Sequence, residues 1–126
     1  MDKLFVIGFG GCIGAMLRYL ISILSSRYLG GQIPYGTLIV NVLGGILIGV
    51  IIEISINTKI LSSNMVLFLT TGLLGGLTTF STFSLETVNL FQTGRYIASC
   101  INIFLNLFLS IGGVIIGRYL FIFNRY

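Results

Sequence analysis

The stretch GGLTTFSTFSLE, residues 75–86, interleaves two phenylalanines with hydroxyl-bearing residues inside a long apolar run. Phe80 and Phe83 are three residues apart, so they share roughly one side of a helix. An aromatic ring has an electropositive edge that can stabilise an anion without carrying a charge, and the hydroxyls can donate hydrogen bonds to the same anion. Neither group would hold the anion as tightly as a buried arginine, which suits conduction. The alternative interpretation is that the two rings form part of a helix core.

A glycine cluster precedes the rings. Gly72, Gly75 and Gly76 lie in the middle of the apolar run, where clustered glycines weaken a helix. Hydroxyls can then satisfy the freed backbone groups, or an ion can take the carbonyls. Irregular backbone at membrane depth survives only when it is buried in protein or lines a cavity, and a broken helix is a common way to make an ion site. We therefore expect a third helix that is broken near its middle.

A second set of polar residues lies in the last apolar run. Ser99, Asn102, Asn106 and Ser110 are spaced at three, four and four residues, which is typical of one helical face. Such side chains often form hydrogen bonds between membrane helices. They can also form a track of donors along a permeation path, and the spacing leaves both interpretations open.

The composition places these residues in a membrane. Hydrophobic types make up 56% of the 126 residues and charged types only 8%, against about 25% charged residues in a soluble domain. A fold of this length cannot bury so much apolar surface away from water. A bilayer must therefore be the solvent.

Several function classes are disfavoured. The net charge is +4, but the seven cations are scattered, so we expect no nucleic-acid partner. The sequence has no histidine, no metal-ligand cluster and no nucleophile with an adjacent base, which argues against an enzyme. Cys12 and Cys100 lie in apolar runs and are expected to be small buried hydrophobes without a disulfide.

Four windows have the roughly 20 mostly apolar residues that a spanning helix needs. They cover about residues 4–28, 36–56, 64–92 and 97–123. The links between them are short, so neighbouring helices should be antiparallel. We expect an all-α membrane protein in which residues 1–126 form a single transmembrane four-helix domain.

Pairs of glycines four residues apart let membrane helices approach closely. The first span has Gly10 and Gly14, and the second has Gly45 and Gly49. We expect both pairs to lie at helix contacts.

The charges at the span ends give only a weak orientation signal. An even number of spans puts both termini on one side, together with the cations Lys3, Lys59, Arg118 and Arg125. The other side has Arg27 and Arg95, and Arg18 lies inside the first span. Lys and Arg near span ends set orientation, so this balance permits insertion in both orientations. Four helices leave little room for a water-filled path, and a chain that moves a solute should therefore act as an oligomer.

Two alternatives to an ion pathway remain at this point. A small proton-coupled exporter of cationic drugs usually has a carboxylate near the midplane, whereas Glu53 and Glu86 lie toward the ends of their spans. A structural subunit without transport of its own is the other alternative.

Three segments resemble one known family. GTLIVNVLGG at 36–45, GLLGGLTTFSTFSLE at 72–86 and the glycine-rich first span with Arg18 are similar to the CrcB/Fluc fluoride channels, over essentially the whole chain. The resemblance implies a dual-topology homodimer of antiparallel subunits, multi-pass in the plasma membrane of a bacterium. It also implies two passive fluoride pathways that export the anion and give fluoride resistance.

The resemblance further implies roles for individual residues. Phe80 and Phe83 would line the pores with their ring edges, and Asn41 would donate a hydrogen bond to the same path. Further hydroxyl and pore-end positions are Thr37, Ser81, Thr82, Ser110 and Glu86.

The last implied roles concern an ion, a vestibule and a variable position. The backbone carbonyls of Gly75 and Thr78 would surround a structural sodium ion at the dimer centre, and Arg18 would draw anions into a vestibule. Relatives vary among tyrosine, histidine and others at the position of Asn106. Asparagine keeps a hydrogen-bonding group there but removes a ring.

Overall fold

The computed structural model describes residues 2–30 and 33–123, with side chains up to residue 120, and within these ranges all regular secondary structure is helical. Four stretches are long and apolar enough to cross a membrane. They are α1 (Asp2–Tyr28), α2 (Tyr35–Asn57), the segmented third span (Ser63–Gln92) and α6 (Tyr96–Phe123). The prediction of an all-α chain with four spans is confirmed.

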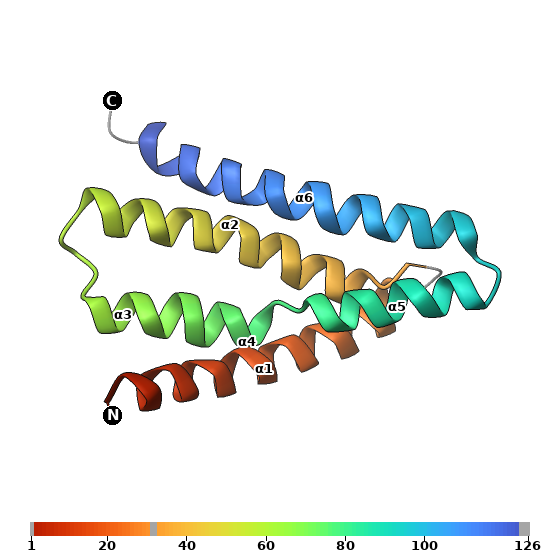
Figure 1. The fold of residues 1–126 in the computed structure, drawn as a ribbon, viewed down its shortest axis with the longest axis horizontal. Coiled ribbons are helices and arrows are strands. Elements are labelled where there is room, and N and C mark those ends of the chain that lie inside the picture. Colours follow the sequence, from red (N-terminus) through yellow and green to blue (C-terminus); the bar gives the residue numbers. More distant parts are fainter. Residues whose placement is uncertain (1, 31–32, 124–126) are drawn as a thin grey trace.

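The third span consists of three continuous helical segments, then one break, then a fourth helix (Figure 1). These are α3 (Ser63–Leu67), the π-helix η1 (Phe68–Leu74), the short α4 (Gly75–Leu77) and α5 (Phe80–Gln92). Thr78 and Thr79 between α4 and α5 have extended backbone, with ψ of 157° and 120°. The break thus follows the glycine cluster, whose members are themselves helical.

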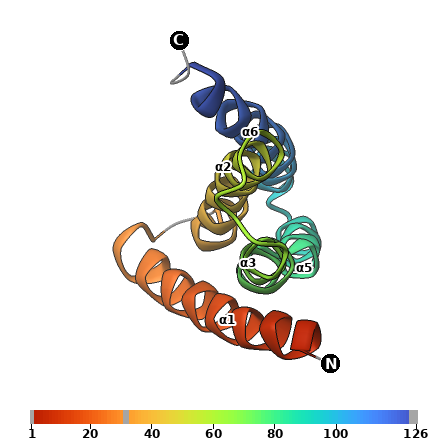
Figure 2. The same ribbon diagram turned by 90° about the vertical axis from the view of Figure 1, so that its left-hand side faces the viewer.

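The helices are layered and do not close into a ring. The most extensive contact joins α2 to α6, while α1 packs against η1, α4 and α2, and α5 reaches α6. Figure 2 shows α1 and α6 on opposite sides of this arrangement. The buried core is accordingly small: Val40, Leu74 and Leu77 form its centre. Most large apolar side chains are exposed, as expected for a surface that faces lipid.

Glycines set the contact between α1 and the third span. A Cβ atom added at Gly10 would lie 2.7 Å from the carbonyl oxygen of Phe68, and one at Gly14 would overlap the carbonyl oxygen of Leu73. Gly72 is equally close to α1, since its added Cβ would lie 2.8 Å from the Ile7 carbonyl oxygen. The first expected glycine pair therefore lies at a helix contact. A side chain at any of these positions would push the two backbones apart.

The second glycine pair lies at the contact between α2 and α6. An added Cβ at Gly45 would lie 2.5 Å from the Ser110 carbonyl oxygen, and one at Gly49 would overlap the carbonyl oxygen of Val114. Both predicted pairs therefore lie where two helix backbones meet. This contact fixes how α6 presents its polar face to α2.

The cations divide between the two ends as predicted. α1 begins, α6 ends and α2 joins α3 at one end of the molecule (Figure 1). Lys3, Lys59 and Arg118 belong to this end, whereas Arg27 and Arg95 belong to the other. Arg125 lies outside the described residues.

Candidate functional site

The break in the third span is fixed by a side chain from α2. The backbone N–H of Thr79 donates to Asn41 Oδ1 at 2.8 Å, and Asn41 Nδ2 donates to the Thr79 carbonyl at 3.2 Å. In a continuous α-helix the same N–H would bond to the carbonyl of Gly75, four residues earlier. Asn41 Oδ1 therefore replaces the helical acceptor that the Thr79 N–H lacks, and this N–H would be costly to bury unpaired.

The Thr79 side chain then begins α5. Its Oγ1 accepts a hydrogen bond from the Thr82 N–H at 3.2 Å and donates one to Thr82 Oγ1 at 3.0 Å. This is a helix N-cap, in which a hydroxyl satisfies one of the free amides of the first turn. Thr79 thus starts α5, while its neighbour Thr78 is the C-cap of α4.

The end of α4 leaves the carbonyls of residues 75–78 without helical donors, and the hydrogen bonds at the break show this directly for the first and the last of them. The Thr79 amide bonds to Asn41 instead of Gly75, and the Thr82 amide bonds to the Thr79 hydroxyl instead of the Thr78 carbonyl. Carbonyl oxygens at the end of a helical segment carry partial negative charge. Backbone oxygens of this kind, those of Gly75 and Thr78 among them, belong to the ligand type that hard cations take.

The two phenylalanines lie together beside the break. The ring centroids of Phe80 and Phe83 are 5.6 Å apart, and the ring planes are inclined by 57°. In the single chain, Phe80 is 79% exposed. Both rings border a cavity of about 620 Å³ between α2, the third span and α6, which Asn41, Asn106 and Ser110 also line.

The polar face of α6 is buried. Asn106 and Ser110 on this face line the cavity, and Asn102 lies one turn before Asn106. Asn102 is 0% exposed and Asn106 is 5% exposed. Asn106 Nδ2 donates to Asn102 Oδ1 at 3.0 Å, and Asn41 Nδ2 donates to Asn106 Oδ1 at 3.0 Å. The stripe thus forms hydrogen bonds between helices, which was one of the two interpretations of its spacing. Ser110 Oγ is buried without a hydrogen-bond partner among the described residues.

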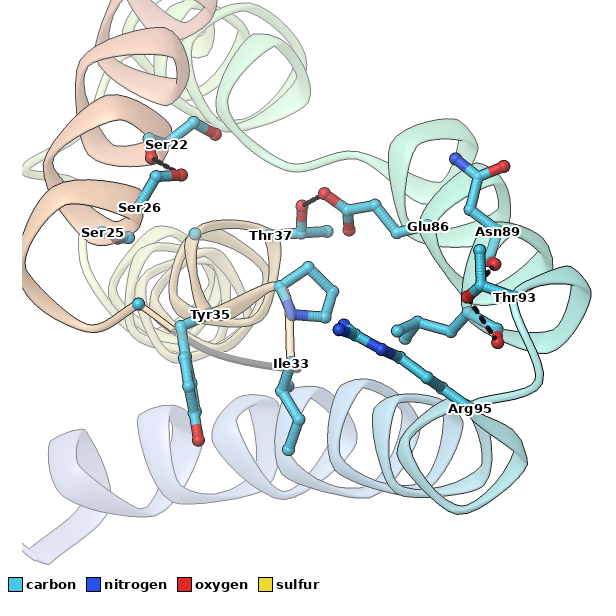
Figure 3. Close-up of a pocket in the computed structure, with 14 residues that line it drawn as sticks. Ser22, Ser25, Ser26, Ile33, Tyr35, Thr37, Glu86, Asn89, Thr93 and Arg95 are labelled. Carbon is cyan, nitrogen blue, oxygen red and sulfur yellow. Dashed lines mark hydrogen bonds between the residues drawn. The ribbon is translucent and has the colours of Figure 1, made fainter.

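A second cavity, of about 470 Å³, opens at the end of the molecule where α2 begins (Figure 3). It brings together Thr37 and Glu86, whose Oγ1 and Oε1 atoms are 2.8 Å apart with the hydroxyl as donor. Glu86 Oε2 is buried and has no partner within the described part of the chain. Ser25 on α1 and Arg95, which precedes α6, also line this cavity.

Two predicted site residues lie apart from these groups. Arg18 on α1 is partly exposed, not buried, and lines neither cavity. Ser81 is exposed on the first turn of α5, with its hydroxyl 3.4 Å from Thr79 Oγ1. The structure therefore gathers the rings, Asn41, Asn106 and Ser110 at one cavity, and Thr37 with Glu86 at the other.

Sequence reasoning missed an ion pair between α2 and α6. Arg118 Nε lies 2.9 Å from Glu53 Oε2, and Asn57 Nδ2 donates to Glu53 Oε1 at 2.8 Å. It also missed Thr87, whose hydroxyl accepts from Asn102 Nδ2 at 2.9 Å. The partners come from different spans, so local spacing gives no signal for either contact.

The fold and the site define a multi-pass membrane protein in which a broken helix, two aromatic rings and buried amides border an intramembrane cavity. The chain belongs to the CrcB-like family: a family model described as CrcB-like protein, Camphor Resistance (CrcB), matches residues 5–118. It is a multi-pass bacterial membrane protein, and its relatives are named as channels, not as enzymes.

Similar proteins cover nearly the whole chain. A protein of Clostridium novyi (strain NT) is 55% identical over 121 residues, which is 94% of each chain. A protein of Clostridium perfringens (strain ATCC 13124) is 54% identical over 113 residues, 90% of this chain and 88% of its own. A protein of Shewanella sp. (strain ANA-3) is 45% identical over 125 residues, 99% of each chain. All three are named Fluoride-specific ion channel FluC.

Proposed function

We propose that this chain forms a passive, fluoride-selective channel that exports fluoride from the cytoplasm. The observation that carries the proposal is the cavity at the broken third span, which two aromatic rings and uncharged polar groups line within a chain that aligns over nearly its whole length with proteins named as fluoride channels. Hydrogen fluoride crosses membranes as a neutral acid and ionises in the more alkaline cytoplasm. A passive exit for the trapped anion would therefore give fluoride resistance.

The uncharged side chains that line the cavity support the proposed pore lining. Phe80 and Phe83 offer electropositive ring edges, while Asn41 and Ser110 offer uncharged donors. Ser81 and Thr82 on the first turn of α5, with Thr37 and Glu86 at the second cavity, would extend the same path. A strongly hydrated anion needs many donors to replace its water, and contacts without a full positive charge bind weakly enough to release it.

The working unit is an antiparallel homodimer with two such pathways. In the single chain the main cavity is open at the surface and Phe80 is mostly exposed, so a second copy is needed to enclose an ion path. The nearly balanced cations at the two ends allow both orientations in the membrane. Arg18, which lines neither cavity of the single chain, would act in a vestibule of the dimer.

A structural sodium ion would lie at the dimer centre, held by the carbonyls of Gly75 and Thr78 from both subunits. The donor set supports this assignment, because both carbonyls have lost their helical partners to Asn41 and Thr79. Such an ion would supply a fixed positive charge at the junction of the two broken helices.

A fluoride-electrode efflux assay on liposomes containing only this protein tests the proposal. Phe80→Ile and Phe83→Ile should leave a folded protein with sharply reduced fluoride efflux, because each removes a ring edge from the cavity. Phe104→Ile is the matched control, since Phe104 is an exposed ring on α6 that lines neither cavity. Efflux at the wild-type rate from both cavity variants would contradict the assignment of the rings, and a wild-type protein without efflux would contradict the function.

A further inference from the structure

A directional series of hydrogen bonds runs from the backbone of α5 into α6. Thr87 Oγ1 donates to the Phe83 carbonyl at 2.8 Å and accepts from Asn102 Nδ2 at 2.9 Å. Asn102 Oδ1 then accepts from Asn106 Nδ2 at 3.0 Å. A carbonyl only accepts, so the first bond fixes the direction of the next two. The Asn106 amide is thereby set with its nitrogen toward Asn102 and its oxygen toward α2.

The same direction is fixed independently from the other end. The Thr79 backbone N–H only donates, and it donates to Asn41 Oδ1 at 2.8 Å. The Asn41 nitrogen must therefore be the atom that faces Asn106 Oδ1, at 3.0 Å. Two backbone groups at opposite ends of the series thus require the same orientation of Asn106.

This arrangement uses both hydrogens of the Asn41 amide. One goes to the Thr79 carbonyl at 3.2 Å and the other to Asn106 Oδ1 at 3.0 Å. An anion in the cavity can therefore accept from Asn41 only by displacing one of these oxygens. The Thr79 carbonyl belongs to the fixed backbone of the break, whereas Asn106 Oδ1 is a side-chain atom of a residue that lines the cavity.

We propose that the Asn106 carbonyl oxygen is a resident acceptor that holds the Asn41 donor between anion passages and sets how weakly the anion binds. The inference rests on the proposed function. When the site is empty, Asn106 satisfies a donor that would otherwise be costly at membrane depth. An anion forms a stronger, charge-assisted bond and displaces it. When the anion leaves, Asn106 Oδ1 takes the hydrogen back, which favours release.

The test is the fluoride dependence of the initial efflux rate for Asn106→Leu, a substitution that keeps the branching of the side chain at Cγ and removes the acceptor. Removing one neutral competitor should lower the half-saturating fluoride concentration roughly two- to tenfold. The maximal rate should fall, because release slows. Fluoride-dependent protection against thermal unfolding in detergent should begin at correspondingly lower fluoride.

Ser99→Ala is the matched control. The Ser99 hydroxyl donates to the Thr87 carbonyl at 3.0 Å, so its loss removes one partly buried hydrogen bond between α5 and α6 and leaves the contacts of Asn106 in place. Its half-saturating concentration should equal that of the wild type. If Asn106→Leu does not fold, Asn106→Ala should show the same tightening.

The outcomes separate this inference from the function. Fluoride efflux by the wild type with an unchanged or raised half-saturating concentration in the Asn106 variant would overturn the resident acceptor alone. An equal shift in Ser99→Ala would also overturn it, because the effect would then come from general loosening of the interface. Absence of wild-type efflux would overturn both proposals.

Discussion

At the scale of the residue, two polar side chains do what glycine was expected to do. Asn41 Oδ1 replaces the helical acceptor of the Thr79 amide, and the Thr79 hydroxyl caps the next helix. The glycines before the break remain helical. The break is thus made by hydrogen bonds that compete with the helix, which is a known property of Asn and Thr side chains.

Thr79→Val should destabilise the folded chain by about 0.5–2 kcal/mol, because it removes the cap of α5 while keeping the side-chain volume. Unfolding by increasing SDS in detergent micelles measures this change. Thr79→Ser keeps the hydroxyl and should remain close to the wild type. Equal stabilities for the valine and serine variants would show that the cap makes no contribution.

Some of the candidate site could be predicted at this scale. The three-residue spacing of Phe80 and Phe83 placed the rings together, and the spacing on α6 placed Asn102 and Asn106 on one buried face. Both predictions depend on positions within a single helix. The contacts of Asn41 with Thr79 and of Glu53 with Arg118 could not be predicted, because they join different helices and no local pattern specifies them.

At the scale of the element, the π-helix and the glycines of α1 match each other. Gly10 and Gly14, four residues apart, meet the carbonyls of Phe68 and Leu73, five residues apart. The π-helix has the wider turn that this mismatch requires. The hydropathy of the four spans predicted their positions well, because it depends on composition alone. It could not predict the π-helix, which depends on a neighbouring span, whereas the glycine cluster correctly indicated a break near the middle of the third span.

Gly14→Ala should destabilise the protein by about 1–3 kcal/mol, because the new methyl group would overlap the Leu73 carbonyl and push two backbones apart. Gly8→Ala on the same helix is the control, since nothing lies within 4 Å of its added Cβ. The same SDS titration compares the two variants. If both unfold at the same SDS concentration, the close contact does not limit packing at this position.

At the scale of the whole molecule, the single chain is an open layer with a small core and a cavity at its surface. Figure 2 shows α2 and the third span between α1 and α6, so two outer helices face away from each other. The proposed partner would cover the cavity that Phe80 borders. The nearly balanced cations at the two ends permit insertion in both orientations.

A single reporter cysteine tests the two orientations. Lys59→Cys, in a chain with Cys12→Ala and Cys100→Ala, should react with a membrane-impermeant maleimide both in intact cells and in inside-out vesicles. Leu109→Cys, an exposed residue within α6, should react in neither. Labelling of residue 59 from one side only would exclude dual topology.

The bond between Asn41 and Thr79 has a consequence for biogenesis. The two residues are 38 positions apart, and the second span leaves the ribosome first. Until the second span contacts the third, the Asn41 side chain is not available to the backbone of Thr79. The segment around Thr78 can then satisfy its backbone groups only by its own helical hydrogen bonds. It follows that the bond which fixes the bend can form only when the second and third spans are in contact.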